Sequence, residues 1–181
     1  MNARWRTYCI VPLAVMAAGP VAGWAAQYLA LEEAQKLCFP GADAFVPSDI
    51  TLTREQMRAV KKDSGVRART GTQKLWRAMR GQEFLGWFIK DEVLGKHELI
   101  TWALALGPDG AVRRIEILDY RETYGYEVRG AQWRAQFYGK KHGAALKLDR
   151  DIKNIGGATL SCRHITDGVK RLLSFYELFL K

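Results

Sequence analysis

The chain has 181 residues, enough for one domain with its own core, and its composition, 48% hydrophobic and 26% charged, excludes a disordered or fibrous protein. No internal repeat is present, which excludes a solenoid. The formal net charge of +9 comes from basic residues scattered along the sequence, which favours an anionic membrane surface or an acidic partner over nucleic acid.

Residues 1–25 predict an export signal. Arg4 and Arg6 precede an uncharged, mostly apolar run over residues 9–22, and residues 23–25 (Gly-Trp-Ala) place small side chains where a signal peptidase reads them. Cleavage after Ala25 removes two arginines and no acid, which lowers the net charge from +9 to +7. The alternative is an uncleaved membrane anchor, because the uncharged run continues to Ala26 and approaches the length of a bilayer span. We expect a periplasmic protein in either case.

Two short helices follow the predicted signal. The first is expected over residues 30–38 and ends at Phe39-Pro40-Gly41. Thr53 and Gln56 form a capping box that opens a second helix over residues 54–63. We therefore predict that residues 26–74 are an N-terminal helical accessory region.

An antiparallel meander of three or four strands is predicted next. Its last two strands flank a turn with the sequence Gly-Pro-Asp-Gly at residues 107–110, which is typical of a hairpin. The expected strands are residues 75–79, 84–93, 99–106 and 111–120.

The C-terminal part predicts a polar loop and two more helices. The loop covers residues 121–128, and a short helix over residues 132–138 carries Trp133 and Phe137 four residues apart. The last helix has an apolar stripe formed by Ile165, Val169, Leu172, Leu173, Tyr176 and Phe179. Such a helix packs on one face of the sheet, so we predict an α+β fold: a small antiparallel sheet packed against helices, with an N-terminal helical extension.

Residues 154–161 (Asn-Ile-Gly-Gly-Ala-Thr-Leu-Ser) lie just before this helix. Glycines allow positive φ and close approach of a ligand, and a helix start offers unpaired N–H groups and the positive end of the helix dipole. The pattern predicts an anion site, with a phosphate as the ligand. The alternative from the residues alone is an ordinary glycine loop in which Ser161 or Thr166 caps the helix.

Residues 157–161 (Gly-Ala-Thr-Leu-Ser) resemble the flavinylation motif of the FMN-binding domain family, which includes the FMN-carrying subunits of the Rnf and Na⁺-translocating NADH:quinone oxidoreductase complexes. Residues 122–125 (Glu-Thr-Tyr-Gly) resemble the family's Glu-Thr-Pro-Gly loop, and Trp133, Phe137, Gly139 and Lys140 resemble its Trp…Phe-x-Gly-Lys segment. The resemblance covers about residues 84–173, so we assign residues 75–181 to an FMN-binding domain.

The resemblance implies that FMN is esterified through its phosphate to the Thr159 hydroxyl by an exported flavin transferase that uses FAD. Ser161, Lys140 and the backbone N–H groups of residues 156–159 are expected to hold the phosphodiester, and Glu122 and Thr123 the ring edge or ribityl chain. The expected cofactor-binding residues are Gly156, Gly157, Ala158, Thr159, Leu160, Ser161, Glu122, Thr123 and Lys140.

The other aromatic residues, the histidines and the cysteines belong to no motif that assigns them a function. The aromatic residues that are candidates for stacking on a flavin, with packing in the core as the alternative for each, are Tyr124, Tyr126, Trp133 and Trp87. His97, His142 and His164 lack metal-ligand spacing, although a phosphate contact by His164 is open. Cys38 and Cys162 are free to form a disulfide in an oxidising compartment.

The predicted function is electron transfer between membrane-associated or periplasmic redox partners, by a carrier rather than an enzyme with its own substrate. The alternative is an interaction or sensory module that keeps the fold without the flavin. Two departures from the family pattern favour that alternative: Lys153 stands where the family has an acid, and Gly156 stands where it has Ser or Thr.

Overall fold

The computed structural model describes residues 28–181, so the predicted export signal lies outside the described residues. Within them, no helix is both long and apolar enough to cross a bilayer. The helices are α1 (Leu31–Cys38), α2 (Arg54–Ser64), α3 (Ala131–Arg134) and α4 (Thr159–Phe179), with 3₁₀ turns η1 (Tyr126–Arg129) and η2 (Ala135–Phe137). The strands are β1 (Ala44–Pro47), β2 (Ile50–Thr51), β3 (Thr72–Arg80), β4 (Glu83–Leu94), β5 (Leu99–Leu106) and β6 (Val112–Tyr120).

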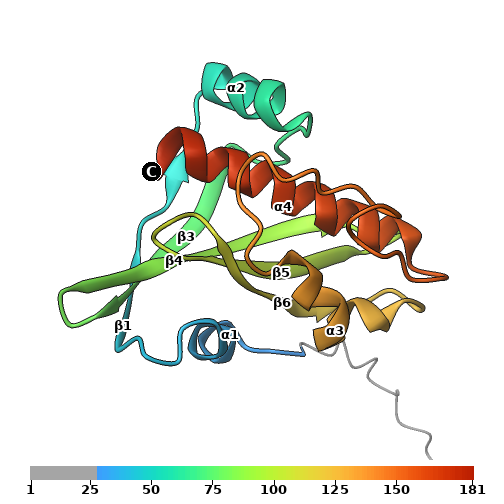
Figure 1. Ribbon diagram of the computed structural model, residues 1–181, viewed down its shortest axis with the longest axis horizontal. Coiled ribbons are helices and arrows are strands. Elements are labelled where there is room, and N and C mark those ends of the chain that lie inside the picture. Colours follow the sequence, from blue (N-terminus) through green and yellow to red (C-terminus); the bar gives the residue numbers. More distant parts are fainter. Residues whose placement is uncertain (1–27) are drawn as a thin grey trace, which may run out of the picture.

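The strands form one six-stranded antiparallel sheet in the order β1-β3-β4-β5-β6, with β2 also paired to β3. Helix α4 covers one face of this sheet, α1 covers the other, and α2 lies on the outer side of α4 (Figure 1). The predicted α+β fold is therefore confirmed.

Strands β3 to β6 divide their side chains between two cores, because successive residues of a strand point to opposite faces. Ile89 and Leu104 enter the larger core, which α4 completes, while the neighbouring residues Phe88 and Ala103 enter the smaller core beneath α1. The sheet is thus buried on both faces, which explains why β5 reads as an almost continuous apolar run.

The apolar stripe of α4 lies against the sheet as predicted, with Ile165, Val169 and Leu172 fully buried. Gly168 allows the helix to approach closely, since a Cβ there would lie 2.7 Å from the ring of Trp102. The helix begins at Thr159 itself, so the expected attachment residue is in the first turn and not ahead of it.

Residues 28–74, predicted to form an accessory region, contain both predicted helices. The Thr53 side chain accepts from the Gln56 N–H at 3.2 Å, and the Gln56 side chain accepts from the Thr53 N–H at 2.8 Å, which confirms the capping box. The region also contributes β1 and β2, which are not predicted from the sequence. Both strands are short and largely exposed, so they lack the apolar alternation of a buried strand.

Cys38 and Cys162, the two cysteines within residues 28–181, are free thiols on opposite sides of the sheet, so the disulfide considered from the sequence does not form. Cys38 belongs to the core beneath α1, and Cys162 belongs to the core beneath α4. Burial raises the pKa of Cys38 to about 12 and that of Cys162 to about 11, so both thiols stay protonated at neutral pH.

Candidate functional site

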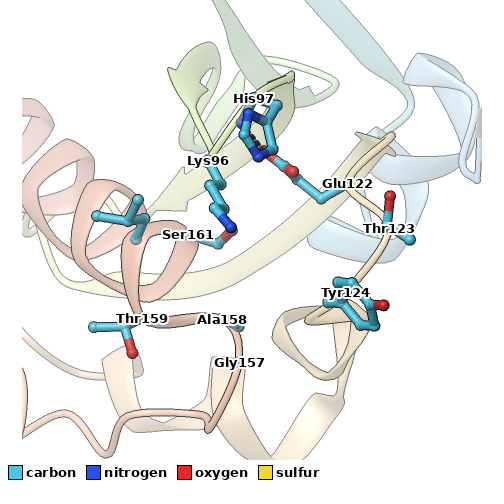
Figure 2. Close-up of a pocket in the computed structure, with 10 residues that line it drawn as sticks. Lys96, His97, Glu122, Thr123, Tyr124, Gly157, Ala158, Thr159 and Ser161 are labelled. Atoms are coloured by element: carbon cyan, nitrogen blue, oxygen red, sulfur yellow. Dashed lines mark hydrogen bonds between the residues drawn. The ribbon is translucent and has the colours of Figure 1, made fainter.

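A pocket of about 360 Å³ opens where three segments meet: the start of α4, the loop after β6 and the β4–β5 turn (Figure 2). Its volume is within the range of about 300–1,000 Å³ that small-molecule sites occupy. The residues that line it are Lys96, His97, Glu122, Thr123, Tyr124, Gly157, Ala158, Thr159, Leu160 and Ser161. The structure therefore brings together seven of the nine residues expected from the sequence to bind the cofactor.

The glycine segment turns sharply into α4. Gly157 has φ of +81°, a left-handed conformation that favours glycine, and the Ala158 N–H donates to the Ile155 carbonyl at 3.0 Å. Among the described residues no side chain caps the helix at Ala158. The N–H groups of the first turn are consequently open to an anionic ligand, which the helix dipole also favours.

Thr159 is half-buried at the pocket wall. Its Oγ1 accepts a hydrogen bond from Asn154 Nδ2 at 3.1 Å, and Asn154 Oδ1 in turn accepts from the Ile155 N–H at 2.9 Å. Asn154 thereby fixes the direction of the Thr159 hydroxyl. This contact is not predicted from the sequence, although Asn154 lies within the glycine segment to which the motif belongs.

Tyr120 connects the two loops that carry the family motifs. Its hydroxyl donates to the Tyr124 carbonyl at 2.6 Å and lies 3.3 Å from Ser161 Oγ. Burial raises the pKa of Tyr120, so the hydroxyl keeps the proton that it donates. Ser161, expected to hold the phosphodiester, is itself buried and partnered by this tyrosine.

Glu122 lines the pocket, but its carboxylate is already engaged. Oε1 accepts from the backbone N–H groups of His97 at 2.6 Å and Glu98 at 3.0 Å, in the β4–β5 turn. Desolvation raises the pKa of Glu122, but these N–H groups together with that of Lys96 hold it below its ordinary value. The structure gives Glu122 the role of fixing the turn that carries Lys96 and His97 to the pocket.

Lys140 and Gly156 do not line the pocket. The Lys140 carbonyl accepts from the Val112 N–H at 2.9 Å, which fixes this residue at the start of β6, whereas the pocket lies beyond the end of β6. The nine residues of β6 span about 25 Å at about 3.3 Å per residue. The Lys140 ammonium lies 3.4 Å from Asp151, and the lysine in the pocket is Lys96.

Of the four aromatic candidates for stacking, one lines the pocket. Tyr124 is 73% exposed and forms part of the wall, whereas Trp133 is buried and donates its indole N–H to the Lys153 carbonyl at 2.8 Å. Trp87 packs edge-to-face on Phe84 and against the core, and Tyr126 is exposed outside the pocket. His164 lies outside it as well, with its ring bonded to the Leu94 carbonyl.

Residues 95–174 match the family model described as the FMN-binding domain. The resemblance to the FMN-binding domain family is confirmed. The matched segment contains every residue that lines the pocket. The predicted cofactor, FMN, is confirmed by the same match.

Two known proteins resemble the chain over most of its length. One is a subunit of the proton-translocating ferredoxin:NAD(+) oxidoreductase complex of Clostridium ljungdahlii; it is 28% identical over 138 residues, which cover 72% of this chain and 75% of that protein. The crystal structure of Shewanella oneidensis NqrC superposes with a TM-score of 0.50 at 15% identity, over 79% of this chain and 74% of that one, which shows a shared fold. These similarities support the predictions that the protein is a flavoprotein and that it takes part in electron transport.

The donor set of the pocket fits the phosphate end of FMN. Thr159, Lys96 and the uncapped first turn of α4 all line the same cavity. Each of these groups favours a phosphate ester, the lysine by its charge and the helix start by its N–H groups.

Proposed function

We propose that this chain is an exported flavoprotein in which FMN is joined by a phosphoester to Thr159 and which passes electrons between membrane-associated or periplasmic redox partners. The observation that carries the proposal is the pocket itself, which is lined by Thr159, by the uncapped start of α4 and by Lys96. FMN supplies the redox chemistry when bound. The chain supplies the attachment point, the charge that faces the phosphodiester and the walls of the site.

The proposed attachment is a transfer from FAD, catalysed by an exported flavin transferase. The bond between Thr159 Oγ1 and the FMN phosphorus forms, the diphosphate bond of FAD breaks, AMP leaves, and the hydroxyl loses its proton. Asn154 donates to Oγ1 and therefore keeps the hydroxyl oriented while leaving its O–H free to be deprotonated. Lys96 and the N–H groups of the first turn of α4 are placed to hold the resulting phosphodiester.

The walls of the pocket suit the rest of the flavin. Thr123 and Tyr124 project from the loop after β6 on the side opposite Thr159 (Figure 2). Tyr124 occupies the position of the family's proline, and its exposed ring offers an apolar surface to a planar ligand. A site that is open to solvent on one side suits a carrier, because a partner must approach the cofactor closely.

Intact mass of the protein after co-expression with the transferase tests the proposal. We expect one added FMN less one water, and a fluorescent band on a denaturing gel. Thr159→Val keeps the shape of the side chain and should abolish both signals without unfolding the protein, while Thr159→Ser should retain part of them. Covalent flavin in Thr159→Val would place the link elsewhere and overturn the assignment.

A module without flavin is the second candidate, and one observation favours it. Asp151, the acid nearest to Lys153 in the sequence, is engaged elsewhere: its carboxylate accepts from the N–H groups of Leu146 at 2.9 Å and Lys147 at 2.6 Å. This candidate predicts no flavin on the wild-type chain even when the transferase is shown to modify another substrate.

Export is part of the proposal and has its own test. The basic start and apolar run of residues 1–25 support cleavage near Ala26 and a periplasmic location. N-terminal sequencing of the protein from its host should begin near Ala26. A sequence that begins at Met1 on membrane-bound protein would favour the uncleaved anchor, and Met1 on soluble cytoplasmic protein would contradict export.

A further inference from the structure

Nearly half of the formal charge of the chain is concentrated around α2. Residues 52–71 contain six basic and two acidic side chains, a net charge of +4, compared with +9 for the whole sequence. The fold gathers five of the six into one groove of about 720 Å³, whose basic lining is Arg54, Arg58, Lys61, Arg67 and Arg69. All five are exposed, and within residues 28–181 none of them forms an ion pair.

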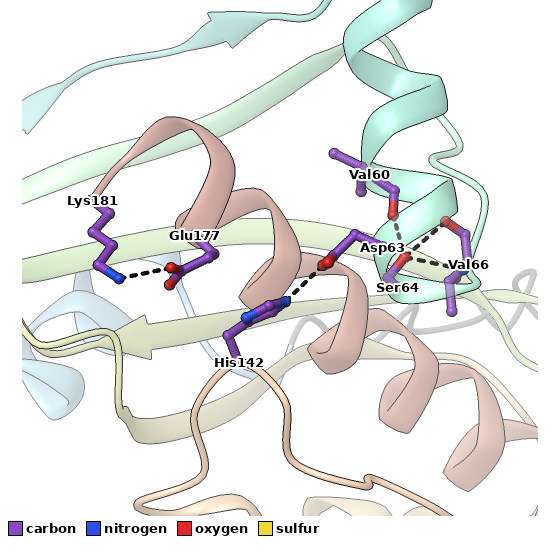
Figure 3. Close-up of polar contacts among 7 residues, drawn as sticks. All are labelled: Val60, Asp63, Ser64, Val66, His142, Glu177 and Lys181. Atoms are coloured by element: carbon purple, nitrogen blue, oxygen red, sulfur yellow. Dashed lines mark hydrogen bonds and ion pairs between the residues drawn. The ribbon is translucent and has the colours of Figure 1, made fainter.

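Contacts at the end of α2 hold the two walls of this groove in place. Ser64 Oγ donates to the Val60 carbonyl at 2.7 Å and accepts from the Val66 N–H at 3.0 Å, which ties the helix to the loop that follows (Figure 3). Asp63 lies 2.7 Å from His142 Nε2, which joins α2 to the loop before α4 (Figure 3). The cations on α2 and those on the loop that follows it line one depression.

The basic groove continues toward the proposed flavin site. Arg67 and Arg69 also line a neighbouring groove together with Leu94 and His164. Leu94 is the last residue of β4, and the turn that follows it carries Lys96, which lines the pocket that Thr159 also lines. Leu94 and Leu160 are exposed apolar side chains along this path, 44% and 38% accessible, and the second groove contains one acid, Asp167.

We propose that the groove between α2 and the loop of residues 67–71, here called the α2 groove, docks an acidic segment of a redox-partner protein. Unpaired cations attract carboxylates over long distances and speed the encounter of oppositely charged proteins. An extended acidic chain can enter the groove and reach cations on both walls, whereas a lipid surface, flat on this scale, reaches only the rim. The exposed leucines then offer apolar contact next to the flavin.

This proposal rests on the proposed electron-transfer function, but its test does not need the flavin. The probe is a fluorescein-labelled decamer of glutamate, titrated into the purified protein at low salt and followed by anisotropy. We expect binding that weakens as salt is added, because exposed charges are screened. Loss of flavin loading in a parallel sample would count against the proposed function and leave this measurement intact.

Charge-reversal variants locate the binding. The triple variant Arg58→Glu, Lys61→Glu and Arg69→Glu should bind the decamer at least about tenfold more weakly, since each exposed ion pair is worth about 1.5- to 5-fold in affinity and reversal adds repulsion. The matched control reverses three exposed cations elsewhere that form no ion pair within residues 28–181, Lys36, Lys147 and Arg150, and should stay within about threefold of the wild type. Equal losses in the two triple variants would show a response to net charge alone and overturn the proposal.

Two further measurements decide whether the α2 groove binds an acidic peptide or an anionic membrane. Carbodiimide cross-linking joins lysine amines to carboxylates, so peptide mapping should find the decamer on Lys61; cross-links confined to lysines outside the groove would overturn the proposal. Vesicles of phosphatidylcholine with 30% phosphatidylglycerol are the competing probe. Vesicle binding that the groove variant alone loses, without decamer binding, would assign the groove to an anionic membrane instead.

Discussion

Gly125 and Ala158 touch across the two loops that carry the family motifs. A Cβ on Gly125 would lie 2.4 Å from the Ala158 Cβ and 2.8 Å from the Tyr120 hydroxyl, and Gly125 has φ of +86°. Glycine is therefore required here twice, by its backbone conformation and by the absence of a side chain. The contact packs the loop after β6 closely against the turn into α4, and both of these segments line the pocket.

We predict that Gly125→Ala both destabilises the protein and blocks flavin loading. A non-glycine residue at positive φ costs about 1–3 kcal/mol, and the clash with Ala158 adds to that cost by moving the two loops apart. Gly139→Ala is the matched control, because Gly139 has φ of +75° and open space around its Cβ position. Chemical denaturation should show a larger loss for Gly125→Ala, and equal stabilities of the two variants would contradict this prediction.

Glu122→Gln should loosen the β4–β5 turn, because the carboxylate that accepts from His97 and Glu98 is lost. The charge-assisted part of these bonds is worth about 1 kcal/mol.

The pH dependence of this loss has a definite sign. The pKa of Glu122 is lower in the folded protein than its ordinary value, so its contribution to stability is complete above the unfolded-state pKa and is lost as pH falls through the folded-state pKa. The difference in unfolding free energy between wild type and Glu122→Gln should therefore be constant above about pH 5 and shrink below about pH 4. A difference that grows on acidification would rule out the charged contact.

Local signals in the sequence were enough for most of the elements. The Thr53–Gln56 capping box and the apolar stripe of α4 involve residues within one or two helical turns, and both are observed. The Gly-Pro-Asp-Gly turn set the limits of β5 and β6 within one residue. Strands β1 and β2 were missed because their pairing with β3 is carried by backbone hydrogen bonds, which leave no apolar pattern.

A residue that lines the pocket could be predicted from the sequence only where it belongs to a family motif. Lys96 and His97 reach the site because β4 pairs with β5, and this pairing places their turn against residue 122, a relation that the spacing of residues does not contain. Lys140 was expected at the phosphate from its motif, but its carbonyl accepts from the Val112 N–H, which holds it at the opposite end of β6. The basic residues that look scattered in the sequence converge because α2 and the following loop fold back on each other.

The assignment of Lys96, in place of Lys140, as the lysine that binds the phosphate can be tested directly. In the Thr159→Val background, where flavin binds without a covalent link, Lys96→Gln should weaken the binding of FMN by up to about fivefold, the upper range for an exposed charge pair. Lys140→Gln should leave the affinity unchanged, since its ammonium faces Asp151. Titration of FMN fluorescence measures both, and the reverse order of effects would restore Lys140 to the site.

Asn154 should control the rate at which Thr159 is modified. Its side chain is the only hydrogen-bond partner of Thr159 Oγ1 within residues 28–181, and it holds the hydroxyl in one orientation. Asn154→Ala releases that orientation, and the loss of one hydrogen bond of about 1 kcal/mol slows transfer of FMN from FAD about fivefold. The final yield should still reach one flavin per chain, because the hydroxyl itself remains.

The variant Asn154→Asp tests whether the Thr159 hydroxyl needs a hydrogen-bond donor at position 154 or only a side chain that orients it. A carboxylate cannot donate to Oγ1, but it can accept the hydroxyl proton, and it introduces an acid next to Lys153, where the family pattern has one. We therefore expect Asn154→Asp to load at least as fast as the wild type, and Lys153→Ala, a change at an exposed neighbour, to load at the wild-type rate. The measurement is in-gel flavin fluorescence against time with transferase and FAD in excess. If Asn154→Ala loads as fast as the wild type, the contact with Thr159 has no part in the attachment.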